Sequence, residues 1–308
     1  MPTRRRRTTA ARASRRGRIR WGALVALAGI AALTIYGVLV VSRQLHSYGS
    51  SRQTERSTQA VTPPAVVASP QAAPETSPEP SALRSAPLKT AQLAIIIDDC
   101  GYSMERDRRF LQLPIPVTLS ILPMTPHGKE IAAEAQVAGK FIMLHLPMEP
   151  ESAQAHPGPG AITTAMTDAQ VHDQVESDVE SLPPVLGANN HMGSKATSDA
   201  RVMRDVLGVF QERHLFFIDS LTSGSSVGGS LAKQLGVATT SRDVFLDNST
   251  TLPYIEGQLD EAQRVALKQG SAVAIGHPNA TTAQALTAYI PRMQAAGITF
   301  VPAQSLVR

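Results

Sequence analysis

Cysteine is almost absent from this sequence, in which Cys100 is the only one among 308 residues. A single thiol cannot form an intramolecular disulfide, so the chain is not a disulfide-stabilised scaffold, and its redox compartment cannot be inferred from cysteine use. The G-x-S-x-G pattern of α/β-hydrolases is also missing, which argues against a serine nucleophile on a sharp turn. Ser194 and Ser220 therefore do not indicate a serine hydrolase.

Acidic residues are missing from residues 1–20, which contain nine arginines. This segment accounts for the positive net charge of +4, because the rest of the chain has 20 basic against 25 acidic side chains, a net charge of −5. The basic charge therefore belongs to a terminal tail and does not indicate a nucleic-acid-binding surface. We expect no nucleic-acid partner.

Charged residues are also missing from residues 21–41. A helix of this length would measure about 31 Å, which is enough to cross the hydrocarbon core of a bilayer. Arginines flank only its N-terminal side, so the positive-inside rule predicts a cytoplasmic tail over residues 1–20. We predict a single-pass anchor in the inner (cytoplasmic) membrane, with the rest of the chain in the periplasm or outside. The alternative is a cleaved signal peptide, for which Ser14-Arg15-Arg16 suggests a twin-arginine type.

Periodic apolar positions are absent from residues 42–90, which are rich in Pro, Ser, Ala, Thr and Gln. Proline favours extended backbone, and a segment without apolar periodicity has no face with which to build a core. We predict a disordered spacer here, followed by a folded domain over residues 91–308.

From residue 91 onward, short apolar runs alternate with amphipathic segments. The predicted strands are residues 93–98, 117–122, 141–146, 186–192, 215–219, 273–277 and 298–302. Four predicted helices end in a glycine directly before a strand, at Gly139, Gly236, Gly270 and Gly297. Apolar strands that alternate with helices indicate a parallel sheet covered on both faces. The domain is long enough for a closed or nearly closed β/α barrel of the α/β class.

Two helices can be delimited more closely. Thr167 and Gln170 form a capping-box pair that begins a helix over residues 168–182. Ser198 is predicted to cap the next helix. The residues expected to face the core from these helices are Val171, Val175, Val179, Leu182, Val202, Val206 and Phe210.

Polar residues gather at the predicted C-terminal ends of the strands, where β/α barrels carry their chemistry. Asp98 and Asp99 end the first strand, and a cation bound by one carboxylate, with the other held as a base, would relieve their repulsion. Capping of the next helix is the alternative. His145, His191 and His277 end other strands, where each alone could be a satisfied core histidine. Together with the carboxylates they suit zinc or a similar divalent metal with an open position for water.

In these residues the sequence resembles the divergent polysaccharide deacetylase family, a distant branch of the NodB-type carbohydrate deacetylases. The resemblance covers essentially all of residues 91–308. It rests on five segments in order: IIIDD (95–99), HLPMEP (145–150), NNHMGS (189–194), FFIDS (216–220) and GHP (276–278). The resemblance implies a (β/α) barrel of the glycoside hydrolase/deacetylase type, commonly with seven strands, and export to the bacterial envelope.

The resemblance also implies roles for individual side chains. Asp98 matches the carboxylate that acts as general base, and Asp99 matches the one that binds the metal. His277 matches the histidine that protonates the leaving amine. We further predict that Asn190 and Asp219, at two other strand ends, contact the substrate.

The segment HLPMEP (145–150) differs from the corresponding motif of the wider superfamily. Ordinary deacetylases have two metal-binding histidines four residues apart, whereas His145 is followed at this spacing by Glu149. The implied metal ligands are therefore Asp99, His145 and His191, with Glu149 as a substitute ligand. The usual arginine-proline-aromatic motif after the fourth strand is also missing.

The leading functional hypothesis is hydrolysis of an acetyl group on an envelope glycan, such as peptidoglycan, by a water molecule that a divalent metal activates. Zinc is the preferred ion. One alternative is a degenerate deacetylase-fold module that binds peptidoglycan or a partner protein without turnover. Another is a metal phosphoesterase, which has only the aspartate and histidine inventory in its support.

Overall fold

The computed structural model describes residues 90–308. The predicted tail over residues 1–20, the anchor over residues 21–41 and all but the last residue of the spacer over residues 42–90 lie outside the described residues. Within residues 90–308, no helix is both long and apolar enough to cross a membrane.

Nine strands form one sheet in which every pairing is parallel. They are β1 (Ala91–Cys100), β2 (Val117–Ile121), β3 (Phe141–Met148), β4 (Gly187–Met192), β5 (Phe216–Asp219), β6 (Thr239–Ser241), β7 (Val244–Phe245), β8 (Ser271–Gly276) and β9 (Ile298–Phe300). Their order is β6-β5-β4-β3-β2-β1-β8-β7, and β9 pairs with the beginning of β1. All seven predicted strands are present, while β6 and β7 are too short to show a pattern in the sequence.

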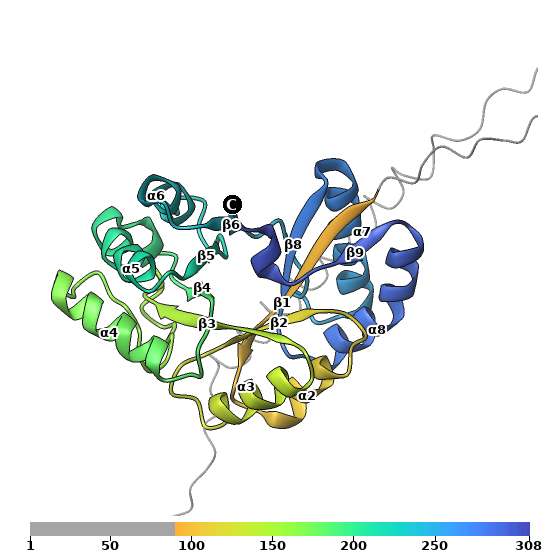
Figure 1. Ribbon diagram of the computed structural model, residues 1–308, viewed down its shortest axis with the longest axis horizontal. Coiled ribbons are helices and arrows are strands. Elements are labelled where there is room, and N and C mark those ends of the chain that lie inside the picture. The colour runs from red at the N-terminus through yellow and green to blue at the C-terminus, as the bar shows by residue number, and fades with distance from the viewer. Residues whose placement is uncertain (1–89) are drawn as a thin grey trace, which may run out of the picture. The chain divides into compact units, whose positions relative to one another are not determined.

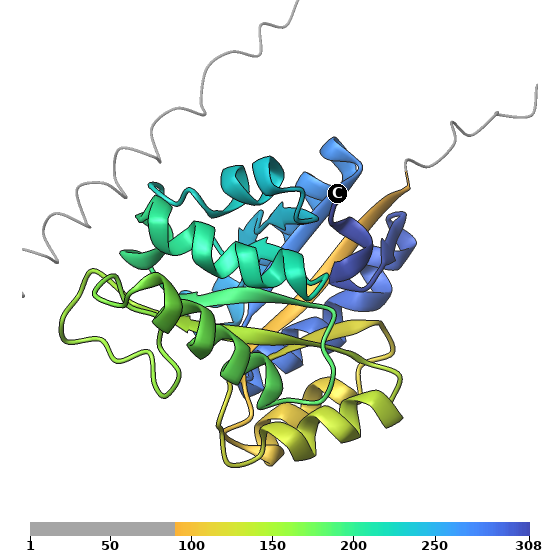
Figure 2. The same ribbon diagram turned by 60° about the vertical axis from the view of Figure 1, so that its left-hand side comes forward.

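The sheet curls, and the helices lie on its outer face (Figures 1 and 2). They are α2 (Met104–Leu111), α3 (Gly128–Val137), α4 (Asp168–Glu180), α5 (Ala200–Glu212), α6 (Gly228–Leu235), α7 (Leu252–Gln269) and α8 (Ala280–Ala295). Two short 3₁₀ turns, η1 (Ala196–Ser198) and η2 (Ala303–Leu306), complete the described elements. The expectation of a parallel α/β fold is confirmed, although the helices cover one face of the sheet and not both.

The side chains of each strand alternate between two cores, as the two-residue period of a strand requires. On β1, Ile95 and Ile97 belong to the large core between sheet and helices, whereas Ala94 and Ile96 belong to a small core inside the curl. The small core consists of Ala94, Ile96, Met143, Phe216, Ile218, Val273, Ile275 and Ala303. Near the C-terminal ends of the strands, the side chains that point to the inside of the curl therefore meet at one opening. We call this opening the mouth.

The C-terminal segment closes the inside of the curl near the beginnings of the strands. The backbone N–H of Val301 donates to the carbonyl of Leu93 at 3.0 Å, and that of Ala303 donates to Oγ1 of Thr118 at 3.1 Å. Because this segment occupies the strand beginnings, the polar mouth at the opposite ends of the strands stays open.

The closed or nearly closed seven-stranded barrel expected from the sequence is replaced by an open, curled sheet of nine strands. Its edges are β6 and β7, between which only Arg242 and Asp243 intervene. The N–H of Arg242 donates to the carbonyl of Asp219 after β5, whereas that of Asp243 donates to the carbonyl of Val273 on β8. The sheet stays open here because two successive residues bond to strands on opposite sides of the seam.

The predicted helix boundaries are largely confirmed. Gly139, Gly236, Gly270 and Gly297 all have positive φ, between 66° and 95°. The capping box of Thr167 and Gln170 is formed at the start of α4. The predicted cap of α5 is wrong by one residue, because η1 places Ser198 in its own turn and leaves Asp199 extended. The carboxylate of Asp199 accepts from the backbone N–H groups of Arg201 and Val202 in the first turn of α5.

Candidate metal and active site

The end of β1 is distorted so that two successive carboxylates reach the same mouth. In a regular strand, neighbouring side chains point to opposite faces. The register between β1 and β2 shifts between Ile97 and Cys100. Within this irregularity Asp99 has a φ of 56°, a left-handed conformation that costs an L-residue about 1–2 kcal/mol. The side chain of Asp98 points to the inside of the curl, as the alternation along the strand requires. The kink turns the side chain of Asp99 to the same side.

Three donor atoms from three strands, β1, β3 and β4, converge at this mouth. Oδ1 of Asp99 lies 2.9 Å from Nδ1 of His191 on β4 and 3.2 Å from Nε2 of His145 on β3. The two ring nitrogens are 3.1 Å apart. The structure thus brings together Asp99, His145 and His191 as a group that could hold a metal ion.

The chemistry of this group suits a divalent cation. Among the described residues, Oδ1 of Asp99 is buried without a hydrogen-bond partner. A buried and unpartnered carboxylate oxygen is costly unless a positive charge compensates it. Histidine nitrogens and carboxylate oxygens are ordinary zinc ligands, and a tetrahedral site with bonds of about 2.0–2.1 Å separates neighbouring donor atoms by about 3.4 Å. The residues present therefore fit zinc or a similar ion.

The protonation state of Asp99 favours metal binding, whereas His145 has to release a proton before it can bind. Burial raises the pKa of Asp99, but His145 and His191 outweigh this effect and hold its pKa well below the usual range. Asp99 therefore remains a carboxylate. Burial lowers the pKa of His145, and the attraction of Asp98 and Asp99 more than offsets that effect and raises it. A cation in the group would compete with that proton, since only neutral imidazole binds a metal.

Asn189 links the group to Asp98. Its Oδ1 accepts from Nδ1 of His145 at 2.8 Å and from the hydroxyl of Ser120 at 2.5 Å. Its Nδ2 donates to both carboxylate oxygens of Asp98, at 2.9 and 3.2 Å, and to the hydroxyl of Ser220 at 3.1 Å. Because a carbonyl oxygen only accepts, Nδ1 of His145 carries a proton and Nε2 can present its lone pair to the cluster.

Asp98 is almost fully buried, with 3% of its surface exposed. Its Oδ2 lies 3.6 Å from Nε2 of His145. Burial raises the pKa of Asp98, while His145 and the hydrogen bond from Asn189 act in the opposite direction without reversing it. A buried carboxylate whose pKa is raised is better suited to accept a proton than an exposed one.

His277 lies directly after β8 and faces the same mouth. Its Nε2 is 3.7 Å from Oδ2 of Asp99, and its Nδ1 is 2.9 Å from Oδ1 of Asp247. Burial lowers the pKa of His277, but the hydrogen bond and charge of Asp247 prevail and raise it to about 9. The other oxygen of Asp247 accepts from the N–H of His277 and from Thr282, each within 2.8 Å. His277 is thus a cation whose orientation is fixed.

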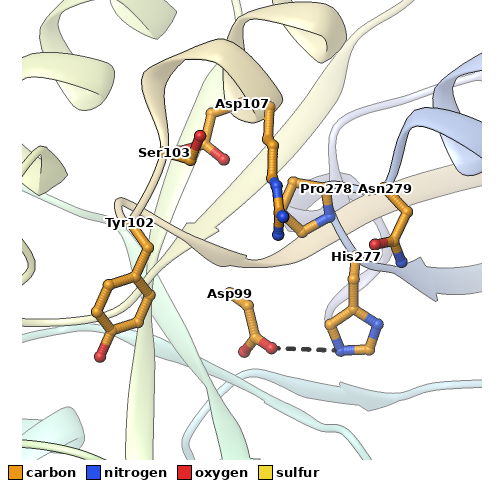
Figure 3. Close-up of a pocket in the computed structure, with 8 residues that line it drawn as sticks. Asp99, Tyr102, Ser103, Asp107, His277, Pro278 and Asn279 are labelled. Carbon is orange, nitrogen blue, oxygen red and sulfur yellow. Dashed lines mark ion pairs between the residues drawn. The ribbon is translucent and has the colours of Figure 1, made fainter.

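A cavity of ≈ 330 Å³ opens beside Asp99 and His277. It is lined by Asp99, Tyr102, Ser103, Arg106, Asp107, His277, Pro278 and Asn279. In Figure 3, Asp99 and His277 face each other at one side of this cavity, and Tyr102 lies on the other side of Asp99. The cavity gives a ligand access to the region between the two side chains.

Glu149 does not join the metal group. Its Oε2 accepts from the N–H and the hydroxyl of Thr164, both at 2.7 Å, and its Oε1 pairs with Lys195 at 2.7 Å. The carboxylate therefore ties together two loops, and its position does not support the predicted role as a substitute ligand. The second histidine of the group comes from the next strand, at His191.

Asn190 and Asp219 also point away from the cluster. The Oδ1 atom of Asn190 accepts from the N–H of Ser220 at 2.9 Å. The carboxylate of Asp219 accepts from the N–H of Leu221 at 2.9 Å and from the hydroxyl of Ser226 at 2.7 Å. Both side chains are nearly fully buried. These bonds shape the loops after β4 and β5, so the positions favour a structural role over substrate contact.

Two residues of the site were missed from the sequence, and both left a signal there. Asn189 lies two residues before His191, so the two share one face of β4. Asp247 follows the apolar residues of β7 in the same manner as Asp98 follows those of β1. Because β7 is so short, the apolar residues before Asp247 were not recognised as a strand.

Comparisons with known proteins agree with this geometry. The family model described as divergent polysaccharide deacetylase matches residues 95–307. An uncharacterized protein of Haemophilus influenzae is 39% identical over 198 residues, which cover 64% of this chain and 70% of that protein. The uncharacterized protein YibQ of Escherichia coli is 34% identical over 223 residues, covering 72% of this chain and 69% of YibQ.

Two solved structures share the fold. An uncharacterized protein from Agrobacterium tumefaciens superposes with a TM-score of 0.68 at 23% identity, over 72% of this chain and 92% of that one. A putative cellobiose-phosphate cleavage protein from Enterococcus faecalis gives a TM-score of 0.52 at 16% identity, over 71% of this chain and all of that one. With the family model matched over most of its length, this chain belongs to the divergent polysaccharide deacetylase family.

Proposed function

We propose that this protein is a metal-dependent hydrolase that removes acetyl groups from a glycan of the bacterial envelope. The observation that carries the proposal is the meeting of Asp99, His145 and His191 at one mouth, with Asp98 and His277 beside them. Family membership supports a carbohydrate deacetylase-like function. The five side chains supply what hydrolysis needs, namely metal ligands, a proton acceptor and a proton donor.

Asp99, His145 and His191 would hold the ion, for which zinc is preferred. When bound, a divalent cation polarises an acetyl carbonyl and lowers the pKa of water. The three side chains contribute orientation, because Asn189 fixes the ring of His145 and the kink at Asp99 directs its carboxylate. Three protein ligands also leave a coordination position free for water or substrate.

Asp98 accepts the proton of the attacking water at its carboxylate. Burial raises the pKa of this group and thereby strengthens it as a base. The two hydrogen bonds from Asn189 hold the carboxylate beside the metal group. Asp98 is therefore both oriented and shielded from bulk water.

His277 donates a proton from Nε2 to the departing nitrogen or oxygen. Its pKa of about 9 keeps the ring protonated at neutral pH. Asp247 binds the proton on Nδ1, so Nε2 is the atom that remains to give a proton to the substrate. Loss of the proton turns His277 into a neutral ring that Asp247 still orients.

The proposal includes a location outside the cytoplasm. The apolar residues 21–41 would anchor the chain in the cytoplasmic membrane and place residues 91–308 beside an envelope glycan such as peptidoglycan. This placement rests on the sequence alone. Fractionation of cells, combined with protease access to the domain in opened spheroplasts, tests it.

The test of the reaction is acetate release by the zinc-supplemented full chain from N-acetylated oligosaccharides and peptidoglycan fragments. Asp98→Asn should lower kcat by about 10²–10⁴-fold, the range for loss of a general base, at unchanged zinc content. Glu149→Gln, a matched carboxylate-to-amide change outside the cluster, should retain most activity. Failure of the wild type to release acetate, or equal release by Asp98→Asn, would contradict the mechanism.

A further inference from the structure

We propose that the cavity beside the metal group selects glycans that carry an acidic substituent, and that Arg106 is the residue that selects them. The inference rests on the proposed function and names the class of substrate. The acidic group is a sugar carboxylate or a sugar phosphate, both of which a guanidinium can bind.

The three arginines of α2 differ in whether they have an ion-pair partner. Arg108 pairs with Glu134 at 2.6 Å, and Arg109 pairs with Glu105 at 2.8 Å. Within residues 90–308, Arg106 has no carboxylate within ion-pair distance, and it is the arginine of the three that lines the cavity. An exposed guanidinium with free donors beside the reaction centre is suited to a ligand anion.

Asp107 also lines this cavity, and one of its carboxylate oxygens is buried and unsatisfied. The residue is 1% exposed, and its Oδ2 accepts from the N–H of Gly101 at 2.8 Å. Among the described residues, its Oδ1 has no hydrogen-bond partner. A buried acceptor of this kind costs free energy unless a ligand or water donates to it.

Two further side chains complete a polar cavity with one aromatic edge. Ser103 precedes α2, but its hydroxyl makes no capping hydrogen bond to that helix and remains available. Tyr102 is 54% exposed and lies opposite His277 across Asp99 in Figure 3. Aromatic rings offer an apolar face together with a polar hydroxyl. A sugar presents matching groups, since its ring has an apolar face and its hydroxyls both donate and accept.

The alternative role of Arg106 is to offset the charges of Asp99 and Asp107 without contacting substrate. The two roles make different demands. A charge that only offsets the carboxylates acts through space, so Arg106→Lys, which keeps the charge, would keep any preference for acidic sugars. A guanidinium that donates paired hydrogen bonds to the acidic group would lose most of that preference in Arg106→Lys. This variant therefore separates the two roles.

The experiment measures binding of matched saccharides to the zinc-supplemented full chain by calorimetry, in an Asp98→Asn background that slows turnover. The neutral probe is N,N′-diacetylchitobiose. The acidic probes are a disaccharide that contains N-acetylmuramic acid, one that contains glucuronic acid, and N-acetylglucosamine 6-phosphate. We expect at least one acidic probe to bind about tenfold or more tightly than the neutral one, as a charge-assisted hydrogen bond allows.

Arg106→Gln should abolish this preference and leave the affinity for the neutral probe unchanged. Arg109→Gln is the matched control on the same helix and should keep the preference, because Arg109 pairs with Glu105 and does not line the cavity. Equal binding of neutral and acidic probes, or a preference that survives Arg106→Gln, overturns the proposal.

Selection of acidic sugars and release of acetate are measured separately, so either can fail without the other. A preference for acidic sugars without acetate release by the wild type would leave a selective binding module. Acetate release at equal rates from neutral and acidic sugars would leave a deacetylase and reject the role of Arg106. The probe that binds most tightly identifies the acidic group as carboxylate or phosphate.

Discussion

Asn189 and Asn190 are adjacent on β4, yet their side chains serve different purposes. Asn189 holds His145 and Asp98, whereas Asn190 accepts from the N–H of Ser220 in the loop after β5. The alternation of side chains along a strand separates the two. They therefore form a matched pair of chemically identical residues in different surroundings.

Asn189→Ala should weaken zinc binding by about 10–100-fold, the usual effect of removing a group that orients a metal ligand. Asn190→Ala should leave zinc affinity unchanged and lower the free energy of unfolding by about 1–3 kcal/mol, because a buried N–H loses its partner. Zinc titration against a competing chelator and urea denaturation measure the two effects. Equal zinc affinity in the two variants would contradict the role assigned to Asn189.

Asp178 on α4 is a buried carboxyl remote from the metal group. Its Oδ1 accepts from Gln174 at 3.0 Å, its Oδ2 has no partner among the described residues, and burial raises its pKa to about 8. The unfolded chain loses this proton near the ordinary pKa of 3.8, whereas the folded chain retains it until about 8. Stability contributed by the protonated group is therefore lost as the pH rises between these values.

Asp178→Asn should raise the free energy of unfolding by about 2 kcal/mol at pH 7.5 and by little near pH 4, because the amide resembles the protonated acid. Asp173→Asn is the control on the same helix, since Asp173 is 84% exposed and should change stability by under about 0.5 kcal/mol. Urea denaturation at both pH values measures the difference. A loss of stability at pH 7.5 in Asp178→Asn would show that the carboxylate is the favoured form.

Two glycines allow the end of one helix to be compared with the interior of another. Gly236 ends α6 with a φ of 72°, whereas Gly257 lies inside α7, and a Cβ at either position would meet nothing within 4 Å. Space is equal at the two sites, so only backbone conformation differs. Alanine is disfavoured in the left-handed conformation and favoured inside a helix.

Gly236→Ala should therefore lower the free energy of unfolding by about 1–2 kcal/mol, while Gly257→Ala should raise it by about 0.5–1 kcal/mol. Chemical denaturation of both variants beside the wild type gives the two signs. A change of the same sign in both would mean that α6 does not end at Gly236 by the left-handed turn.

At the scale of the whole domain, the metal group joins segments that are far apart in the chain. Asp99 and His191 lie near the C-terminal ends of β1 and β4, and His145 lies within β3, so the unfolded chain does not hold the three together. An ion that binds only the folded state stabilises it by mass action. Metal binding and folding should therefore be coupled.

Zinc at 100 times its Kd should raise the free energy of unfolding by about 2.7 kcal/mol, and removal by a chelator should reverse the effect. His191→Ala should lose this response. His156→Ala should keep it, because His156 is exposed and belongs to neither group of possible metal ligands among the described residues. Thermal unfolding with and without zinc measures the shift, and an identical Tm under both conditions would argue against a metal site.

The sequence by itself determined where the elements lie and which residue types collect at the strand ends. Apolar runs located seven strands, glycines located the ends of four helices, and Thr167 with Gln170 located the start of α4. These features depend on neighbours a few residues away, so a local pattern is sufficient to recognise them. Because the strands are parallel, Asp98, His145, His191 and His277 then had to lie toward the same end of the sheet, where the C-terminal ends of the strands are.

Only the tertiary structure decided which side chains meet. The kink at Asp99 turns a second carboxylate inward, and the phase of β4 and β5 directs Asn189 and Ser220 to the cluster in place of Asn190 and Asp219. Likewise, the two-residue strand β7 carries Asp247 to His277, and the sheet stays open between β6 and β7. A shift of one residue along a strand reverses the face of every side chain. That phase is fixed by pairing with distant strands, which no local pattern in the sequence records.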